Sequence, residues 1–340
     1  MSHTYLFILG RTPELSFFEL RTVLPDVERI GESVAVSAHA VPIGRLGGTI
    51  KIAEIIGNPS SLSTFIKPHS TFGISVYGEH AVSRKELEEL KRQSGAARFI
   101  EPRHGSALSS VVVEKNHVDE FIIVNNVLAK TIAVQPFEEW AKRDFGRPYA
   151  DAKSGMLPPK VARMLVNIAG SPGALLDPFC GMGTIVAEAY LSGWRVMGSD
   201  HSPEMVRKAK SNLDWLGAAG KLFVSDATHV SDTLAPNSIH AIVTEPFMGN
   251  VRYPKSDIRN LIKGLEKLYI GCLRDWKKIL VPEGLVIIAL PEYAVGGNEY
   301  FVKKVIDMCE TLGYTIDVGP IAYSRPQAIV RRMFYKFQKI

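Results

Sequence analysis

From residue 174 onward, apolar strand-like runs alternate with helical stretches, and this alternation constrains the fold more than any other feature of the chain. The strand-like runs are ALLDPF (174–179), WRVMGSD (194–200), KLFVSD (221–226), IHAIVTEP (239–246) and LVIIALPE (285–292). Helical stretches between them cover 184–193, 202–217 and 256–280. Apolar strands that alternate with helices predict an α/β fold with a parallel sheet covered on both faces. Such sheets bind ligands at the carboxyl ends of their strands.

The last part of the chain departs from this alternation. TIDVGP (315–320) and QAIVRRMFYKFQ (327–338) are strand-like runs with only a short connection between them. A short connection cannot hold a crossover helix, so we expect the final pair to be an antiparallel hairpin. Arg331 and Arg332 in the last run are interpreted as charges that guard a sheet edge.

The first half of the chain has a mixed pattern that predicts an α+β region. Helices are predicted at 13–24, which Pro13 opens, and at 83–95, where Ser83 is a capping residue. Strands are predicted at 4–10, 33–41, 49–56, 71–78, 109–115, 120–126 and 128–135. A polar segment rich in Gly and Pro then marks a linker at 138–157, and a second domain is predicted at 158–340, beginning with a helix at 158–170.

Composition limits the class of protein and its setting. The chain has 340 residues, a net charge of +5 and three cysteines that are too few and too far apart for a disulfide framework or a zinc site. Its nine histidines show no ligand spacing, so no metal site is expected. We find no signal peptide and no membrane span, and expect a cytoplasmic protein. The sequence pI of about 8.9 permits a nucleic-acid partner without requiring one.

The first strand of the alternating region ends in a glycine loop, DPFCGMGT (177–184). Gly181 and Gly183 allow the backbone to approach a ligand closely, and the helix that follows favours polar or anionic groups at its start. A dinucleotide fingerprint would need glycine where Val186 stands, and the Gly-Lys-Ser/Thr of a P-loop is missing. The loop therefore matches neither phosphate-binding motif. A simple tight turn is the alternative.

Aspartates end the next two strands. Asp200 is placed to accept hydrogen bonds from ribose hydroxyls, and Asp226 to accept one from an adenine amino group. Either residue alone is more often a helix cap or a loop residue. Two aspartates at successive strand ends beside a glycine loop favour a nucleoside ligand. Because no further glycine or arginine pattern suits a pyrophosphate, we infer an adenosine derivative without phosphates.

The fourth strand ends in Thr244-Glu245-Pro246-Phe247-Met248-Gly249. The Glu245 carboxylate and the Pro246 carbonyl can both accept hydrogen bonds from one NH₂ group, and Phe247 with Met248 can cover the face of a base. Two acceptors on one exocyclic amine aim its lone pair at an electrophile, which is orientation catalysis. A proline turn with a capping glutamate is the alternative.

These motifs carry a family resemblance. DPFCGMGT, GSD, SDA and TEPFMG, in this order and spacing, resemble S-adenosylmethionine-dependent class I methyltransferases that modify amino groups of bases. GRPYADAKSGMLPPKVARMLVNIAG resembles more narrowly the archaeal and eukaryotic tRNA guanosine N2-methyltransferases acting on nucleotide 10. FILGRTPELSFFEL, RLGGTIKIA and LAKTIAVQPFEEWAKRDFGRP resemble the N-terminal regions of the same family.

The resemblance implies a fold and a substrate. It implies a Rossmann-like class I methyltransferase sheet, mostly parallel with an antiparallel last strand, over 158–340. It also implies a ferredoxin-like α+β region at 1–70 and a THUMP-like RNA-binding region at 71–137. Residues 1–145 would grip tRNA at its acceptor end. A monomer is expected.

The resemblance also implies roles for individual residues. S-adenosylmethionine would contact Leu157, Pro158, Asp177, Phe179, Gly181, Gly183, Thr184, Asp200, His201, Asp226 and Ala227. Glu245, Pro246 and Phe247 would receive the target guanine. Independently of the resemblance, Lys142, Arg143 and Arg147 lie beside Trp140 and Phe145, a combination that can bind RNA through phosphate contacts and stacking. A solvated linker face explains these cations equally well.

The fourth-strand motif departs from the family pattern Asp-Pro-Pro-Tyr-Gly. Glu245 is longer than aspartate by one methylene, which moves the carboxylate by roughly 1 Å, and the aromatic residue falls one place early. Two alternatives to guanine N2 methylation follow. The chain could methylate adenine N6 in RNA or DNA, or it could be a catalytically weak or silent tRNA-binding homologue. A nicotinamide dehydrogenase is a distant further alternative, because Val186 breaks its fingerprint.

Overall fold

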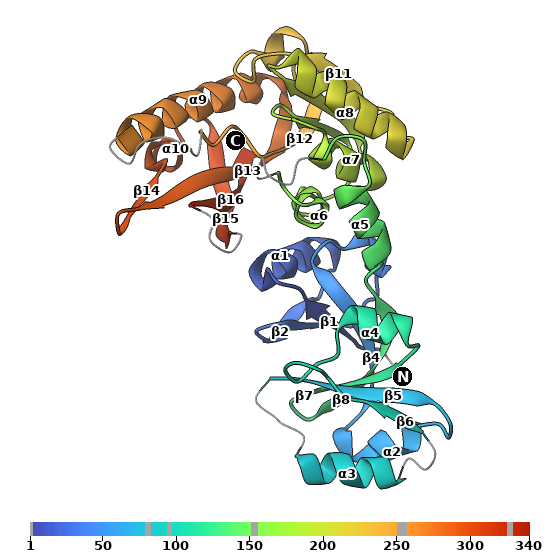
Figure 1. The fold of residues 1–340 in the computed structure, drawn as a ribbon. Coiled ribbons are helices and arrows are strands. Elements are labelled where there is room, and N and C mark those ends of the chain that lie inside the picture. Colours follow the sequence, from blue (N-terminus) through green and yellow to red (C-terminus); the bar gives the residue numbers. More distant parts are fainter. Residues whose placement is uncertain (1–2, 79–82, 94–96, 151–155, 250–256, 325–328) are drawn as a thin grey trace. The chain divides into compact units, whose positions relative to one another are not determined.

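The computed structural model describes residues 3–78, 83–93, 97–150, 156–249, 257–324 and 329–340. The chain divides into two compact units, Met1–Trp140 and Ala141–Ile340. Each unit is built around its own sheet (Figure 1). Helix α5 (Phe137–Phe145) overlaps the start of the segment predicted as a linker and spans the division between the units. The finer predicted boundaries, at 70/71 and 137/138, stay predictions.

The first unit holds a mixed sheet in the order β2-β3-β1-β4-β8-β7-β5-β6 within the described residues. Its strands are β1 (Tyr5–Leu9), β2 (Glu28–Gly31), β3 (Val34–Ser37), β4 (Thr49–Gly57), β5 (Thr71–Tyr77), β6 (Arg98–Ile100), β7 (Asp119–Val124) and β8 (Val127–Val134). Its helices are α1 (Pro13–Val23), α2 (Leu62–Phe65), α3 (Arg84–Gln93) and α4 (Ser110–Lys115). Pairings of β5 with β6 and β7 are parallel and the others antiparallel. The α+β prediction for this half is confirmed.

One predicted strand in this unit is wrong. The run 109–115, rich in β-branched valines, forms helix α4. The Ser109 hydroxyl accepts a hydrogen bond from the Val112 amide at 3.3 Å and so caps the helix start. Only Val113 in this helix is buried. The cap and the single buried face therefore outweigh the strand preference of three successive valines.

The second unit contains the predicted parallel sheet, in the order β11-β10-β9-β12-β13-β16-β15. The strands are β9 (Ala174–Asp177), β10 (Arg195–Asp200), β11 (Lys221–Val224), β12 (Ile239–Thr244), β13 (Leu280–Val295), β14 (Asn298–Phe301), β15 (Tyr314–Tyr323) and β16 (Val330–Lys339). Strands β9 to β13 pair in parallel, whereas β16 pairs antiparallel with both β13 and β15. The predicted fold class, including the antiparallel final hairpin, is confirmed. Because β16 lies between two strands, the interpretation of its arginines as guards of a sheet edge is wrong.

Helices cover this sheet along the chain. They are α6 (Pro159–Ile168), α7 (Thr184–Leu191), α8 (Pro203–Leu216), α9 (Ile258–Ile279) and α10 (Lys303–Asp307). Helices α7 and α8 pack along β9, β10 and β11 (Figure 1). The long helix α9 buries a stripe that includes Tyr269 and Trp276 in the main core, together with Leu176, Ile242 and Ile288 from the strands. Burial of these large side chains fixes α9 against the strands that end at the candidate site. No helix among the described residues is both long and apolar enough to cross a membrane.

Candidate active site

The backbone of the loop after β9 borders open space at Gly181 and packs closely against α8 at Gly183. Gly181 and Gly183 have φ of +49° and +84°, the left-handed region that favours glycine. A Cβ added at Gly181 would meet nothing within 4 Å, so backbone borders open space there. A Cβ added at Gly183 would lie 3.2 Å from the Ala209 Cβ on α8. Gly181 thus leaves room for a ligand, and Gly183 permits the close approach of two helices.

Asp200, at the end of β10, ties the glycine loop to its own strand. Its Oδ2 accepts from the Gly181 amide at 3.1 Å, and its Oδ1 accepts from the Ser202 amide at 2.9 Å. The neighbouring Cys180 amide donates to the Ser199 carbonyl at 2.8 Å. His201 is largely exposed, with its Nδ1 3.3 Å from the Asp200 Oδ1. Hydrogen bonds therefore join the first two strand ends into one connected structure.

Asp226, after β11, is exposed and has a local structural role as well. Its Oδ1 accepts from both the amide and the hydroxyl of Thr228 at 2.8 Å, and these bonds lower the pKa of Asp226. Ala227 is buried, and its carbonyl accepts from the Trp276 indole at 2.9 Å. The loop is thereby fixed to α9. Its proposed contact with an adenine stays a prediction.

Three elements hold the loop after β12. The Arg332 Nε on β16 donates to the Glu245 carboxylate. The Tyr269 hydroxyl on α9 donates to the Phe247 carbonyl at 2.7 Å, and the Tyr293 hydroxyl on β13 donates to the Met248 carbonyl. A Cβ added at Gly249 would lie 2.7 Å from a Leu261 methyl group, so α9 also limits the space at the end of the loop.

The side chains of this loop differ in exposure. Phe247 is 55% exposed, whereas Pro246 is buried. The Glu245 side chain is 19% exposed, and Arg332 is mostly buried. An exposed aromatic ring beside a partly buried carboxylate suits a flat ligand that carries hydrogen-bond donors.

The ends of β9 and β12 meet directly. The Thr244 hydroxyl donates to the Asp177 Oδ1 at 2.7 Å, and the Phe179 amide donates to the same oxygen at 3.1 Å. Burial, together with the negative charges of Asp200 and Glu245, raises the pKa of Asp177 to about 7, although these two hydrogen bonds act to lower it. Three carboxylates from three strand ends therefore influence one another, and the edge favours a cationic ligand.

The remaining residues predicted to bind the cofactor take varied positions. Leu157 is buried, and Pro158 stands just before α6. Phe179 packs edge-on against Trp276, with ring centroids 6.5 Å apart. Thr184 begins α7 and is mostly buried. Their contacts with a cofactor stay predictions.

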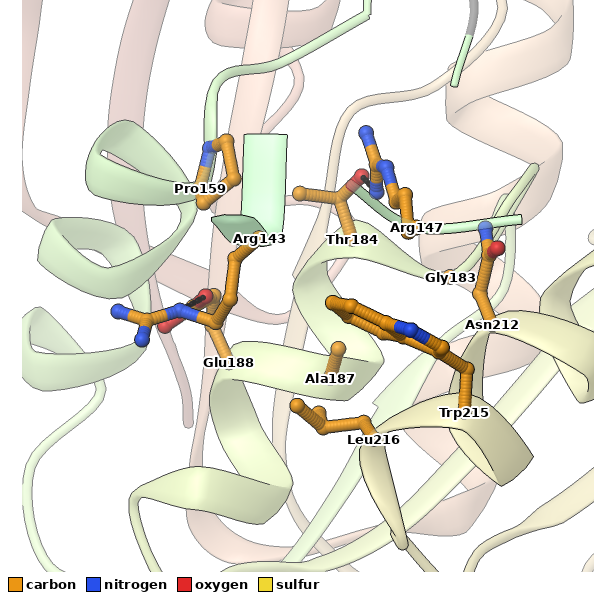
Figure 2. Close-up of a pocket in the computed structure, with 10 residues that line it drawn as sticks. All are labelled: Arg143, Arg147, Pro159, Gly183, Thr184, Ala187, Glu188, Asn212, Trp215 and Leu216. Carbon is orange, nitrogen blue, oxygen red and sulfur yellow. Dashed lines mark hydrogen bonds and ion pairs between the residues drawn. The ribbon is translucent and has the colours of Figure 1, made fainter. Parts of the chain in front are cut away.

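The linker cations predicted to bind RNA divide into two groups, and Figure 2 shows two of the three, Arg143 and Arg147. Arg143 donates to the Glu188 Oε1 at 2.8 Å, and Arg147 donates to the Thr184 hydroxyl at 2.7 Å. Burial lowers the pKa of Arg147. Lys142 is exposed and lies over the Trp215 ring at 5.8 Å. Two of the three cations thus have partners inside the unit, and a role in RNA binding stays a prediction that exposure favours for Lys142.

Glu188 on α7 is 1% exposed and binds two arginines, Arg143 from α5 and Arg163 from α6. The cavity beside this cluster measures about 20 Å³, room for about one water molecule (Figure 2). It is therefore no cofactor pocket, and we assign the cluster to stability. Among the described residues, no group of three or more His, Cys, Asp or Glu side chains is arranged to hold a metal ion.

Sequence reasoning missed Arg332, Tyr269, Tyr293 and Glu188. Arg332, Tyr269 and Tyr293 surround the loop after β12, residues 245–249, which we call the target loop. They come from elements far along the chain, so no local motif connects them to Glu245. Glu188 carried a weak signal, because a glutamate within the apolar helical run 184–193 needs a partner when it is buried.

Comparison with known proteins identifies a similar class of protein for the region that contains these strand ends. Residues 147–296 match the family described as UPF0020, RMKL-like, methyltransferase domain. The chain is 31% identical over 195 residues to a tRNA (guanine(10)-N2)-dimethyltransferase of Pyrococcus abyssi, a match that covers 57% of this chain and 51% of that relative. A protein of the same description from Methanothermobacter thermautotrophicus is 32% identical, over 51% of this chain and 50% of that relative. The matches thus span about half the length of these curated relatives.

Solved structures extend the likeness to the whole fold. The crystal structure of TrmN from Thermus thermophilus matches with a TM-score of 0.58 at 17% identity, over 99% of this chain and 100% of that one. A possible methylase from Clostridium difficile 630 matches with a TM-score of 0.51 at 11% identity, over 98% and 97% of the two chains. Residues 147–296 match a methyltransferase domain, and the predicted resemblance is confirmed.

Proposed function

We propose that this chain, which carries an RMKL-like methyltransferase domain, is an S-adenosylmethionine-dependent tRNA methyltransferase acting on the exocyclic N2 amine of guanosine, at nucleotide 10. One observation carries the proposal. The Glu245 carboxylate stands at the carboxyl end of β12, fixed by Arg332 and close enough to Asp177 to influence its pKa. The target nucleotide is inferred from the curated relatives, which are described as tRNA (guanine(10)-N2)-dimethyltransferases.

The residues at the strand ends fit the cofactor. S-adenosylmethionine supplies, when bound, a methyl group activated by a positively charged sulfur. Open space beside Gly181 adjoins the carboxylate of Asp200, which would accept from ribose hydroxyls. Asp226 would accept from the adenine amine, and Asp177 would balance the sulfonium charge. An acidic edge suits a cationic nucleoside without phosphates.

The target loop would orient the amine. Glu245 and the Pro246 carbonyl would each accept a hydrogen bond from the guanine NH₂, and the exposed Phe247 ring would stack on the base. The amine nitrogen would form the new bond to the methyl carbon as the bond from carbon to sulfur breaks. The proton then lost by the amine would pass to Glu245 or to water. Placement of the amine lone pair is the main contribution of the loop.

Arg332 accounts for the glutamate in this motif. A carboxylate offers roughly four lone-pair positions, so it can bind Arg332 and still accept from an amine. The guanidinium sets the position of the longer side chain and offsets its charge next to Asp177. We therefore propose that Arg332 is a positioning residue that compensates for the additional methylene.

Incubation with labelled S-adenosylmethionine and total tRNA, followed by nucleoside analysis, tests the function. We expect label in N2-methylguanosine or its dimethyl form, and its loss in Glu245→Ala while calorimetry shows unchanged binding of the cofactor. Label in N6-methyladenosine would show that the target base is adenine and not guanine. Binding of cofactor and tRNA without any label would identify a catalytically silent homologue.

A further inference from the structure

A positively charged groove lies between α9 and α10, away from the residues of the candidate active site. Its volume is about 410 Å³. Four cations line it: Lys263, Lys267 and Arg274 from α9, and Lys304 from α10. Glu266 is the acidic residue of the groove, and its carboxylate accepts a hydrogen bond from the Lys304 backbone amide at 3.0 Å. The groove therefore carries a net positive charge.

The side chains of the four cations differ from several lysines nearby in that they have no partner among the described residues. All four are exposed, and none forms an ion pair or hydrogen bond through its side chain within the part of the chain that the structure describes. By contrast, Lys303 pairs with Asp307 on the same short helix, and Lys210 pairs with Asp214 on α8. Unpaired cations that converge on a concave surface attract a polyanion.

The basic residues of α9 are spaced so that they form a row along one side of the helix. Arg259, Lys263, Lys267 and Arg274 follow one another at intervals of four, four and seven residues, which places them on one side of the helix. With a rise of about 1.5 Å per residue, this stripe extends for about 22 Å. A row of this length can contact several phosphates of one strand.

The other side of α9 supports the candidate active site. Tyr269 binds the Phe247 carbonyl, and Leu261 contacts the end of the same loop at Gly249. Gly271, within the groove, lies close to Thr228, which binds Asp226. One helix thus supports the target loop with one side and presents unpaired cations on the other.

We propose that the groove binds the phosphate backbone of the RNA substrate, at nucleotides other than the one that enters the target loop. The identity of that substrate as tRNA rests on the proposed function. The observations favour RNA over an anionic membrane, because no large apolar side chain of α9 or α10 is exposed in the described segments. A helix that lies on a membrane needs such an apolar face.

Two variants with equal charge change test the proposal in the full chain. The groove variant carries Lys263→Gln, Lys267→Gln, Arg274→Gln and Lys304→Gln. The control variant carries Lys208→Gln, Lys210→Gln, Lys221→Gln and Lys303→Gln, which lie outside the groove. We expect the groove variant to bind tRNA at least about tenfold more weakly at ~0.1 M salt and to lower the slope of log K against log salt by roughly 3. The control variant should keep most of the affinity and slope, and both should bind S-adenosylmethionine like the wild type.

Each outcome has one meaning. Equal losses in the two variants, or an unchanged slope in the groove variant, would overturn the groove proposal. Groove-dependent binding of phosphatidylserine vesicles with unchanged tRNA binding would overturn it in favour of a membrane contact. Groove-dependent tRNA binding without methylated guanosine in the wild type would support the groove and reject the proposed activity. Methylated guanosine in the wild type, together with a salt slope that the groove variant leaves unchanged, would support the proposed activity and reject the groove proposal.

Discussion

Arg332 donates a hydrogen bond from its guanidinium to the carboxylate of Glu245, a residue 87 positions earlier in the chain. The contact exists because β16 inserts next to β13, which itself neighbours β12. Arg332 also lies over the Tyr323 ring at 5.9 Å, so β15 supports it from the other side. The last two strands therefore serve the candidate active site as well as completing the sheet.

Arg332→Leu should reduce kcat for methyl transfer by about tenfold to a hundredfold, because a loosely held carboxylate misplaces the amine. The KM for tRNA should change little, since Arg332 is mostly buried. Arg332→Lys should restore part of the rate. The matched control is Arg331→Leu, whose native side chain pairs with Glu292 and Glu299 instead. Equal effects of Arg331→Leu and Arg332→Leu on kcat would refute the positioning role.

Binding of S-adenosylmethionine should strengthen as the pH rises from about 6 to 8. The raised pKa of Asp177, about 7, means that its ionised form, which attracts the sulfonium, becomes dominant only above that pH. S-adenosylhomocysteine, which lacks the sulfur charge, should show a weaker dependence in calorimetry. Asp177→Asn should remove the dependence on pH.

Histidine side chains change charge in the same range. His201, next to Asp200, therefore provides the control for this prediction. His201→Gln should retain most of the pH dependence of cofactor binding. If His201→Gln abolishes the dependence and Asp177→Asn keeps it, Asp177 is not the responsible group.

Phe247→Ala should raise the KM for tRNA by roughly tenfold, because stacking of a base on an aromatic side chain contributes about 1–3 kcal/mol. The affinity for S-adenosylmethionine should stay the same, and Phe247→Tyr should behave like the wild type. Ile316→Ala, at an exposed apolar side chain on β15, is the control. A tRNA KM that is unchanged in Phe247→Ala would place the base elsewhere.

Glu188→Gln should destabilise the second unit by about 3 kcal/mol or more, because it leaves Arg143 and Arg163 without the carboxylate between them. In thermal unfolding, this corresponds to a decrease in Tm of roughly 6–12 °C for a unit of this size. Lys210→Gln breaks an exposed pair with Asp214 and should change Tm by no more than about 1–2 °C. A small effect of Glu188→Gln would mean that relaxation or water compensates for the lost charge.

The sequence predicts the architecture of the second unit because its strands and helices carry strong local signals. Capping illustrates this: the Ser202 hydroxyl accepts from the Met205 amide at 3.4 Å, and Gly217 ends α8 with φ of +70°. Local signals fail where one contact decides the outcome. Residues 109–115 form a helix because Ser109 caps it, although their valines favour a strand.

The polar residues of the candidate site show the same division. Asp177, Asp200 and Glu245 are predictable because each directly follows or ends an apolar strand. Arg332 is not predictable in the same way, since its partner depends on the order of strands in the sheet. Arg147 looks like a linker cation in the sequence, yet tertiary packing buries it against Thr184. Pairings between distant elements are the information that local patterns lack.

The most direct test of the central claim uses two tRNA transcripts that differ in one functional group. One carries guanosine at nucleotide 10, and the other carries inosine, which lacks the N2 amine but keeps the rest of the base. Mass spectrometry after incubation with S-adenosylmethionine should show a mass gain of one or two methyl groups at nucleotide 10 of the first transcript and none in the second. Equal methylation of both transcripts, or of neither while cofactor and tRNA bind, would contradict the account.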